Sequence, residues 1–432
     1  MNLTVRILLS MLAGGVIGLA LQSFGVGPGS FLHTYFVDGI IDVGGSLFVA
    51  SLKLMVVPLV FVSLVCGASS LTGGNLGRMG AKTLGLYLLT TAIAISLALT
   101  LAIVIAPGEG TGIQADQANF VPKNSEGVKQ TLINIFPTNP VAAMAEGNML
   151  QIIVFALLFG AAISHAGEAG ARIRKTFEDL NDVVMALVTM LIKLAPYGVF
   201  CLILKLCAEM NWQEISKLGV YFLTVVLALM VHALVVLPTL LTVLARVNPV
   251  RFLQKLREPI LVAFSTASSA ATLPVTLRTV EERIGVDRKT ASFVLPMGAT
   301  INMDGTAIMQ GVATVFIAQF YGHTLGIDDY LLVILTATMA SIGTAGVPGV
   351  GLVMLALVLQ QVGLPVEGIA LIIGVDRLLD MMRTALNITG DATVATIVGR
   401  SENQFDQSVF EDPNAGILFE SAREEASGTA ST

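Results

Sequence analysis

Charged residues are scarce in this chain of 432 residues. Asp, Glu, Lys and Arg together make up 12% of it, whereas apolar residues make up 54%. Soluble domains usually carry about 25% charged residues. The composition therefore excludes an ordinary soluble protein and indicates a polytopic membrane protein. The net charge is only −6 and comes largely from an acidic C-terminal tail, so a nucleic-acid partner is not expected.

Cysteine and histidine are few as well. Cys66, Cys201 and Cys207 are odd in number and lie in apolar runs, which favours core packing over disulfides or metal binding. The sequence lacks the His and Cys clusters that bind zinc or copper. Structural or loop roles are expected for the four isolated histidines, His33, His165, His232 and His323.

Long apolar runs, by contrast, are abundant, and at about 20 residues per span they predict eight transmembrane helices. The first run lacks a small-residue cleavage site, so we interpret it as a retained span and not as a signal peptide. A kink is expected near Pro196. The predicted spans cover residues 5–24, 38–66, 82–107, 147–166, 177–208, 217–245, 289–320 and 368–400.

Two further apolar stretches are interrupted by small polar residues. Residues 259–277 are broken at 265–269 and again at Pro274, and residues 330–366 are broken at 341–349. Lys and Arg stay in the cytoplasmic loops only if each stretch enters and leaves on the same face of the membrane. We therefore expect two re-entrant hairpins from opposite faces, as in inverted-repeat transporters. Two ordinary spans with small-residue packing interfaces are the alternative.

A polar stripe interrupts the last apolar run. Steps of four, three, four and four residues place its members on one helix face, within an arc of roughly 80°. An ionisable residue at the bilayer centre costs roughly 2.5 to 3.5 kcal/mol or more, so the stripe should face a polar site inside the protein. Its members are Asp376, Asp380, Arg383, Asn387 and Asp391.

The chemistry of this stripe suits an acidic amino acid. The guanidinium of Arg383 is a planar fork for a carboxylate, and Asp380, one turn earlier, suits an ammonium group. The alternative is that these two residues simply pair with each other. A buried pair adds little net stability, however, and does not explain Asn387 and Asp391 beside it.

A second polar group lies inside the seventh predicted span, where Asn302, Asp304 and Thr306 place an amide, a carboxylate and a hydroxyl within five residues. A buried carboxylate at position 304 needs a cation, an arginine or a water-lined pocket. Gly305 would let the helix loosen and turn carbonyl groups toward an ion. Oxygen ligands of this kind suit Na⁺. A structural hydrogen-bond network is the alternative.

Four motifs in this order resemble the dicarboxylate/amino acid:cation symporter family, which includes archaeal aspartate transporters and excitatory glutamate transporters. They are Ser268-Ser269 before residues 271–274, residues 302–306, residues 341–349, and Asp380-x-x-Arg383-Thr384-x-x-Asn387 with Asp391. The resemblance extends to about Ser401. It implies an all-α polytopic membrane protein with eight transmembrane helices and two re-entrant helical hairpins, built from inverted repeats as an elevator-type transporter.

The resemblance also implies a division of the chain within a homotrimer. Residues 1–80 (helices 1–2) and 111–208 (an outside loop and helices 4–5) would form the scaffold. Residues 81–110 (helix 3) and 209–400 (helix 6, hairpin 1, helix 7, hairpin 2 and helix 8) would form the moving transport domain. Residues 401–432 would be a partly disordered cytoplasmic tail. Both termini would lie in the cytoplasm, and short extracellular loops favour a bacterial inner membrane.

The roles of individual substrate-binding residues are likewise implied by the resemblance. Arg383 would hold the side-chain carboxylate with help from Thr306, and Asp380 would hold the amino group. Asn387 and the first hairpin tip would hold the main-chain carboxylate, and the outer hairpin would act as a gate. The complete implied set is Ser268, Ser269, Thr306, Val347, Gly351, Asp380, Arg383, Thr384 and Asn387.

Sodium sites follow from the same resemblance, with Na⁺ as the coupling ion and no catalytic residue or cofactor. The first site would use Gly298, Asn302, Asn387 and Asp391. The second would use Thr300, Met303, Ser341, Ile342 and Thr344. The third would use Tyr87, Thr90, Thr91, Asn302 and Asp304.

Some positions depart from the family pattern. Gln310 stands where proton-carrying eukaryotic members have a Glu, which argues against proton cotransport through this position. Ala267 and Met381 stand where relatives carry an arginine, which argues against potassium counter-transport. Asp391, an Asn in several proton-coupled relatives, favours sodium.

The sequence thus predicts a Na⁺-coupled importer of L-aspartate or L-glutamate and no enzyme. The alternatives are a C4-dicarboxylate:cation symporter, against which an unmatched Asp380 argues, and a proton-coupled glutamate symporter. A passive channel does not explain two gates. An intramembrane aspartyl protease using Asp304 and Asp391 would need a Gly-x-Gly-Asp motif and a Tyr-Asp pair, which the sequence lacks. The choice between aspartate and glutamate rests on about one methylene of pocket depth.

Overall fold

The structure, a computed structural model, describes residues 3–26, 29–69, 75–109, 136–209, 212–341 and 349–416. These residues form helices and no strand, with one isolated bridge between Val286 and Phe405, so the all-α prediction is confirmed. The first half contains α1 (Leu3–Ser23), η1 (His33–Ile41), α2 (Asp42–Ser69), α3 (Asn75–Ile105), α5 (Pro140–Glu146), α6 (Met149–His165), α7 (Gly167–Ile192), α8 (Ala195–Glu209), α9 (Trp212–Val231), η3 (His232–Val236), α10 (Leu237–Leu240) and η4 (Leu241–Ala245). The second half contains α11 (Pro249–Lys255), α12 (Arg257–Thr266), α13 (Ser269–Thr279), η5 (Val280–Ile284), α14 (Arg288–Ile301), α15 (Asp304–Phe320), α16 (Ile327–Ser341), α17 (Val350–Gln361), η6 (Val366–Gly368), α18 (Ile369–Ser401) and α19 (Gln407–Glu411).

Three helical stretches of the described chain are long and apolar enough to cross a membrane, namely Val5–Ser23, Arg78–Ile105 and Ser216–Ala245. Other predicted spans are divided. The fifth becomes α7 and α8, which are separated just before Pro196 as the predicted kink requires. Proline is tolerated in the first turn of α8 because no helical hydrogen bond needs its missing N–H there.

The seventh predicted span is also broken, and the position of the break matters for function. Asn302 (φ −99°, ψ 99°) and Met303 (φ −124°, ψ 51°) leave the helical conformation between α14 and α15. We expected the loosening at Gly305, and that prediction is wrong. Gly305 lies in the first turn of α15, where a Cβ atom would come within 2.7 Å of the Arg383 carbonyl oxygen. The glycine is therefore required for close helix packing.

Helix α12 turns back into α13 at Ala267, which adopts a left-handed conformation (φ 51°). Ser268 caps α13, its hydroxyl accepting a hydrogen bond from the Ala271 amide at 3.2 Å. The two helices pack against each other, as do α16 and α17. The tip between α16 and α17, residues 342–348, lies outside the described part of the chain. The re-entrant placement of both helix pairs in a membrane stays a prediction.

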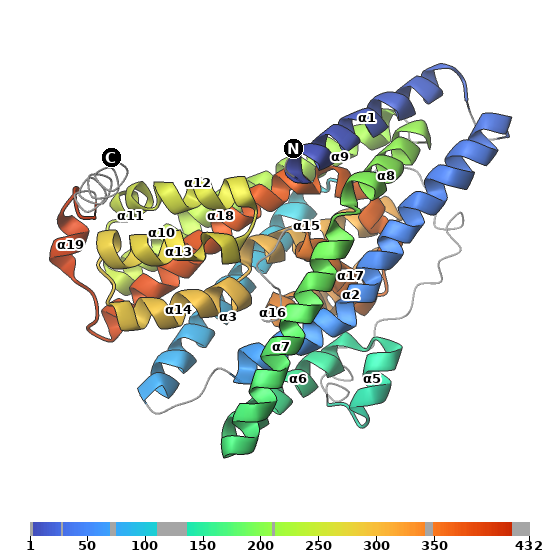
Figure 1. Cartoon of the computed structure of the whole chain (residues 1–432). Helices are drawn as coiled ribbons and strands as arrows, with labels where there is room; N and C mark the ends of the chain where they lie inside the picture. Colours follow the sequence, from blue (N-terminus) through green and yellow to red (C-terminus); the bar gives the residue numbers. More distant parts are fainter. Residues whose placement is uncertain are drawn as a thin grey trace, which may run out of the picture.

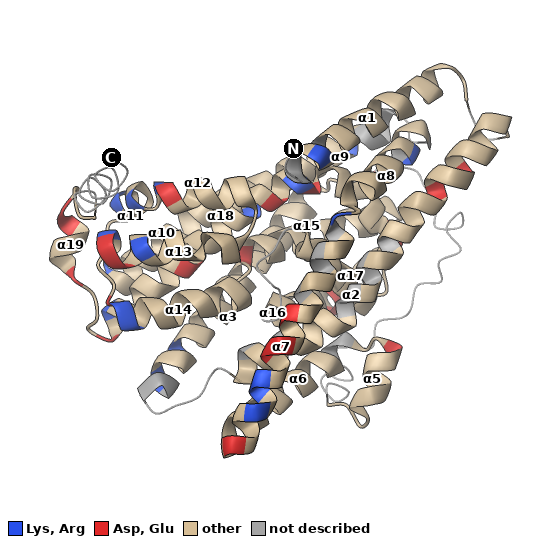
Figure 2. Ribbon diagram, in the orientation of Figure 1, with Lys and Arg blue, Asp and Glu red and all other residues tan. Residues whose placement is uncertain are grey.

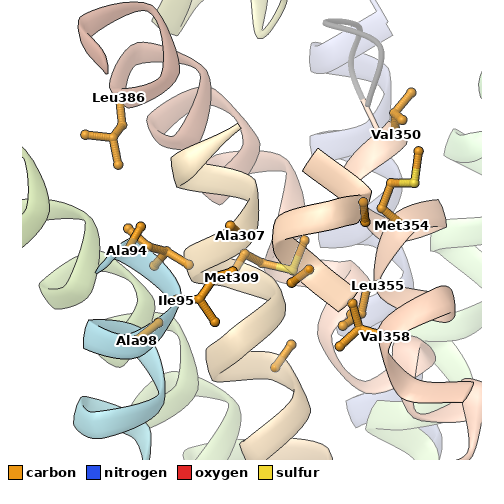
Figure 3. Close-up of a cluster of buried hydrophobic side chains, with 14 of the residues drawn as sticks. Ala94, Ile95, Ala98, Ala307, Met309, Val350, Met354, Leu355, Val358 and Leu386 are labelled. Carbon is orange, nitrogen blue, oxygen red and sulfur yellow. The ribbon is translucent and has the colours of Figure 1, made fainter. Parts of the chain in front are cut away.

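Two sets of helix contacts stand out (Figure 1), and they are joined where α8 packs on α18 and α2 packs on α17. Helix α1 packs on α8, and α2 packs on α6, α7 and α8. Helix α18 packs on α12, α14 and α15, while α3 packs on α15 and α16. Figure 3 shows Ala94, Ile95 and Ala98 of α3 facing Ala307 and Met309 of α15 within a buried apolar cluster. This interface fixes α3 to the broken α14 and α15 pair.

Charges are unevenly distributed over these helices. Figure 2 shows acidic and basic residues crowded at one end of α7, whereas α17 carries none. The exposed end of α7 pairs Arg174 with Glu178 and Lys175 with Asp179, both one helical turn apart. Such exposed pairs stabilise a helix by only about 0.3 to 0.5 kcal/mol each. The charged residues of α18, by contrast, are largely buried.

The start of the predicted tail is folded against the rest of the chain, and residues 417–432 lie outside the described part. The Lys255 ammonium donates to the carbonyl oxygens of Arg283 (2.6 Å), Val409 (2.8 Å) and Asp412 (2.9 Å). The backbone amide of Asp406 donates to the Gly285 carbonyl at 2.7 Å. These contacts hold α19 against η5, the segment that directly follows α13.

Candidate substrate and cation site

The predicted polar stripe lies on α18, one continuous helix, and every member is buried. Arg383 is only 1% exposed and Asp391 only 3%, so both ionisable groups need partners inside the protein. The helix is flanked by α12, α14, α15 and α17. The prediction that the stripe faces the protein interior is therefore confirmed.

The N-terminal half of the stripe, together with Arg377, forms a network of four charges. Arg383 donates from Nη1 to Asp376 Oδ1 at 2.8 Å and from Nη2 to Asp380 Oδ1 at 2.9 Å. Arg377 donates from Nη1 to Asp380 Oδ2 at 3.3 Å. Asp376, to which the sequence assigned no individual role, is thus a hydrogen-bond partner of Arg383. Sequence analysis missed Arg377, although a second arginine within an apolar run was a visible signal.

The α16 and α17 pair contacts this charge network through residues at the start of α17. The backbone amide of Gly349, at the start of α17, donates to Asp380 Oδ2 at 3.2 Å. A Cβ atom at Gly351 would lie 3.3 Å from Arg383 Nη2 and 3.2 Å from the Thr306 methyl group. The structure thus brings Thr306 and Gly351 beside Arg383, as predicted. Val347, the other predicted contact, lies outside the described residues.

Two further predicted substrate residues, Thr384 and Asn387, make contacts of different kinds. Thr384 donates to the Asp380 carbonyl oxygen at 2.8 Å, a bond within its own helix. Asn387 accepts from the Gly305 amide at 2.8 Å and contacts the Met303 sulfur at 3.2 Å. It therefore joins α18 to the start of α15, where backbone N–H groups have no partner within the helix. Ser268 and Ser269 lie at the tip between α12 and α13, both of which pack on α18.

Asp304 is the centre of a buried oxygen-rich group. Its Oδ1 accepts from the Thr91 hydroxyl at 2.7 Å and lies 3.3 Å from the Thr90 hydroxyl. Its Oδ2 lies 3.1 Å from His232 Nε2. Asp304 and His232 are both fully buried, and their contact shows that His232 is not isolated as expected, whereas its structural role stays a prediction. An imidazole midway along an apolar span was the signal that could have identified it.

A second buried carboxylate lies on α18 next to this group. Asp391 Oδ1 accepts a hydrogen bond from the side-chain Nδ2 of Asn302 at 2.9 Å, and the side-chain Oδ1 of Asn302 lies 3.4 Å from the Thr90 hydroxyl. A Cβ atom at Gly298 would collide with Asp391 and with the Tyr87 hydroxyl, so both side chains touch this glycine. The first and third predicted cation sites are therefore adjacent, and Tyr87 lies beside the first.

Of the second predicted cation site, the described residues include only Thr300, Met303 and Ser341. The hydroxyl of Thr300, on an exposed face, donates to the Met297 carbonyl at 3.0 Å. The hydroxyl of Ser341 donates to the Thr338 carbonyl at 2.8 Å. Met303 is in contact with Asn387. Ile342 and Thr344 lie outside the described residues.

The oxygen atoms around the two carboxylates are of the kind that hard cations, Na⁺ among them, prefer. The groups that contact Asp304 and Asp391 are hydroxyls, an amide and an imidazole, none of them permanently charged. Two buried carboxylates with neutral partners need positive charge from elsewhere. In the described residues no group of three or more His, Cys, Asp or Glu side chains forms a site of the transition-metal type.

Known proteins are similar to this chain over nearly its whole length. The model of the sodium:dicarboxylate symporter family matches residues 3–401. The chain is 35% identical over 440 residues to an excitatory amino acid transporter of Caenorhabditis elegans, covering 90% of this chain and 85% of that protein. It is 36% identical over 436 residues to the neutral amino acid transporter B(0) of Oryctolagus cuniculus, covering 90% and 79%. The chain therefore belongs to the sodium:dicarboxylate symporter family.

Proposed function

We propose that the protein is a Na⁺-coupled symporter that imports an acidic amino acid, L-aspartate or L-glutamate. One observation carries this proposal: the buried Arg383 and Asp380 lie one turn apart, beside the broken junction of α14 and α15. A guanidinium and a carboxylate so placed complement the two kinds of charge on an acidic amino acid. A neutral amino acid has no second carboxylate to offer Arg383.

Substrate entry exchanges partners within the charge network. Arg383 keeps Asp376 on Nη1 and turns Nη2 from Asp380 to the substrate side-chain carboxylate, helped by the neighbouring Thr306. Asp380 then accepts from the substrate ammonium. Asn387 and the tip at Ser268 and Ser269 bind the main-chain carboxylate. This arrangement is supported by the 2.9 Å contact between Arg383 Nη2 and Asp380, because a carboxylate already occupies the position proposed for the substrate carboxylate.

Sodium enters as cargo at the carboxylates of Asp304 and Asp391. The first site uses Gly298, Asn302, Asn387 and Asp391, and the third uses Tyr87, Thr90, Thr91, Asn302 and Asp304. The second, formed by Thr300, Met303, Ser341, Ile342 and Thr344, closes the outer gate. The proposal is supported by Asn387, which belongs to both the substrate and the first cation site and bonds to the Gly305 amide.

Movement follows the two sets of helix contacts. We assign residues 1–80 and 111–208 to a scaffold, and residues 81–110 and 209–400 to a transport domain that moves as an elevator. Support comes from α3, which packs on α14, α15 and α16. A homotrimer in a bacterial inner membrane, with both termini in the cytoplasm and no cofactor, completes the proposal.

Uptake into proteoliposomes tests the proposal. Radiolabelled L-aspartate should accumulate above its external concentration when an inward Na⁺ gradient is imposed, and L-glutamate should compete with it. The control is an equal K⁺ gradient, which should drive none. Failure to accumulate either amino acid against its gradient would rule out the symporter. Alanine or glutamine competing better than aspartate would rule out the acidic substrate.

A C4-dicarboxylate:cation symporter is a second candidate, and a specific contact favours keeping it. Asp380 would disfavour a dicarboxylate if it had no positive partner when the substrate lacks an amino group. Asp380 has two such partners, Arg377 and Arg383. Competition by succinate in the same uptake assay measures how far the site accepts this class.

A further inference from the structure

Both oxygens of Asp380 are already occupied. Oδ1 accepts from Arg383 at 2.9 Å, and Oδ2 accepts from Arg377 at 3.3 Å and from the Gly349 amide at 3.2 Å. The Arg377 side chain is 8% exposed and that of Asp380 10%. The contact between them is therefore largely desolvated, where a charge pair has a far larger effect than at the surface.

The buried charges of this half of α18 balance before any substrate binds. Asp376 and Asp380 supply two negative charges, and Arg377 and Arg383 supply two positive ones. When Arg383 turns to a substrate carboxylate, Asp380 loses one of its two positive partners. Arg377 remains, because it lies three residues earlier on the same helix and has no part in the proposed exchange. Asp380 therefore meets the substrate with part of its charge already neutralised.

We propose that Arg377 is a specificity-determining residue, which sets how strongly the site demands an amino group on its substrate. The inference rests on the proposed function. With Arg377 present, Asp380 tolerates a dicarboxylate that brings no ammonium group. Without Arg377, the substrate ammonium becomes the main partner of a buried carboxylate, and a substrate lacking it leaves that charge uncompensated.

A purely structural ion pair makes a different prediction. If Arg377 only stabilised the fold, its removal would weaken all substrates by the same factor. A specificity role changes the ratio between two substrates that differ only in the amino group. L-Aspartate and succinate are such a pair, because both carry two carboxylates on the same carbon chain.

The experiment measures inhibition of radiolabelled L-aspartate uptake by unlabelled L-aspartate and by succinate, in proteoliposomes under a Na⁺ gradient. In Arg377→Gln, the ratio of the succinate to the aspartate inhibition constant should rise about tenfold or more, the effect of roughly one strong charge contact. Arg377→Lys keeps the charge and should stay within about threefold of the unmodified protein. Arg174→Gln removes an exposed arginine of α7 and serves as the matched control.

A double variant separates Arg377 from general damage to the site. In an Asp380→Asn background the carboxylate is gone, so adding Arg377→Gln should leave the ratio of succinate to aspartate binding, measured by thermal shift, unchanged. An unchanged ratio in the single Arg377→Gln variant overturns the inference. So does an equal loss for both ligands, or an unmodified protein that succinate does not inhibit at all. If the unmodified protein accumulates no aspartate, the proposed function itself fails.

Discussion

His232 and Asp304 face each other across two helices, with 3.1 Å between Nε2 and Oδ2 and no solvent exposure of either side chain. An ionised carboxylate can only accept hydrogen bonds, so Nε2 must carry the proton when Asp304 is charged. The imidazole thereby orients one carboxylate oxygen and leaves the other to the hydroxyls of Thr90 and Thr91. We therefore expect His232 to act on the proposed cation site through Asp304.

Removal of this imidazole should weaken sodium binding. Residues that orient a ligand typically change metal affinity by about 10-fold to 100-fold, so His232→Leu should raise the Na⁺ concentration for half-maximal uptake by about tenfold. His232→Gln keeps an N–H donor, so its Na⁺ concentration for half-maximal uptake should lie between those of the unmodified protein and His232→Leu. The control is His165→Gln, on an exposed part of α6. Sodium activation curves of uptake give the answer, and coincident curves for His232→Leu and the unmodified protein would refute the role.

Substitution of Asp376 should tighten substrate binding. Asp376→Asn leaves an acceptor for Arg383 but gives the charge network one excess positive charge. A unit charge a few ångströms away is worth on the order of 2 to 4 kcal/mol at an effective dielectric constant near 20. The change from carboxylate to amide costs the hydrogen bond only about 1 kcal/mol. Charge should therefore dominate, and the half-saturating aspartate concentration should fall roughly tenfold; a rise would mean that the orientation of Arg383 matters more.

A single methyl group at Gly305 should separate α15 from α18. In Gly305→Ala, the new Cβ would lie 2.7 Å from the carbonyl oxygen and 2.8 Å from the Cα of Arg383, both backbone atoms. Such overpacking costs about 1 to 3 kcal/mol and lengthens the bond between the Gly305 amide and Asn387. Thermal unfolding and aspartate affinity should both decline. Gly85→Ala, with no atom within 4 Å of its new Cβ, should do neither; equal behaviour of the two variants would contradict this packing.

The contact between the C-terminal end of α18 and the start of α3 should be sensitive to acid. The hydrogen bond from Lys82 lowers the pKa of Glu402 below its ordinary value of 4.5, and the charges of Arg78 and Lys82 act in the same direction. The fold therefore favours the charged carboxylate. This stabilisation is complete above pH 4.5 and is lost as the pH falls through the lowered pKa of the folded protein.

Thermal unfolding of Glu402→Gln tests this contact. The unmodified protein should be more stable than the variant at neutral pH, and the difference should vanish in acid below the lowered pKa. High salt should reduce it as well, because the contact is exposed. Glu146→Gln, in the separate helix α5, is the control. A difference that persists unchanged in strong acid would exclude ionisation of Glu402 as its cause.

Periodic features of the sequence predicted much of this molecule. The helical fold, the continuous α18 and the buried face that carries Asp380 through Asp391 all follow from spacing and hydropathy. These signals are local, since a side chain three or four residues away necessarily lies on the same helix face. The break near Asn302 was predicted in kind but misplaced, because its exact position depends on how closely α15 approaches Arg383.

Contacts between distant segments could not be read in the same way. His232 and Asp304 are 72 residues apart, and only the packing of η3 near the start of α15 brings them together. The docking of α19 depends on three carbonyl groups, one from η5 and two from α19 and its C-cap, that converge on Lys255. The pair of Arg377 and Asp380 is different, because the two residues lie three apart on α18 and their spacing alone places them on one helix face.

The continuity of α18 has a mechanical meaning. Asp380 and Asp391 are eleven residues apart on one unbroken helix, a separation of about 16 Å at 1.5 Å per residue. One continuous helix therefore carries the proposed substrate residue Asp380 and the proposed sodium ligand Asp391 at a fixed separation. Substitutions near Asp380 can therefore alter substrate choice in related proteins while Asp391 and its neighbours stay unchanged.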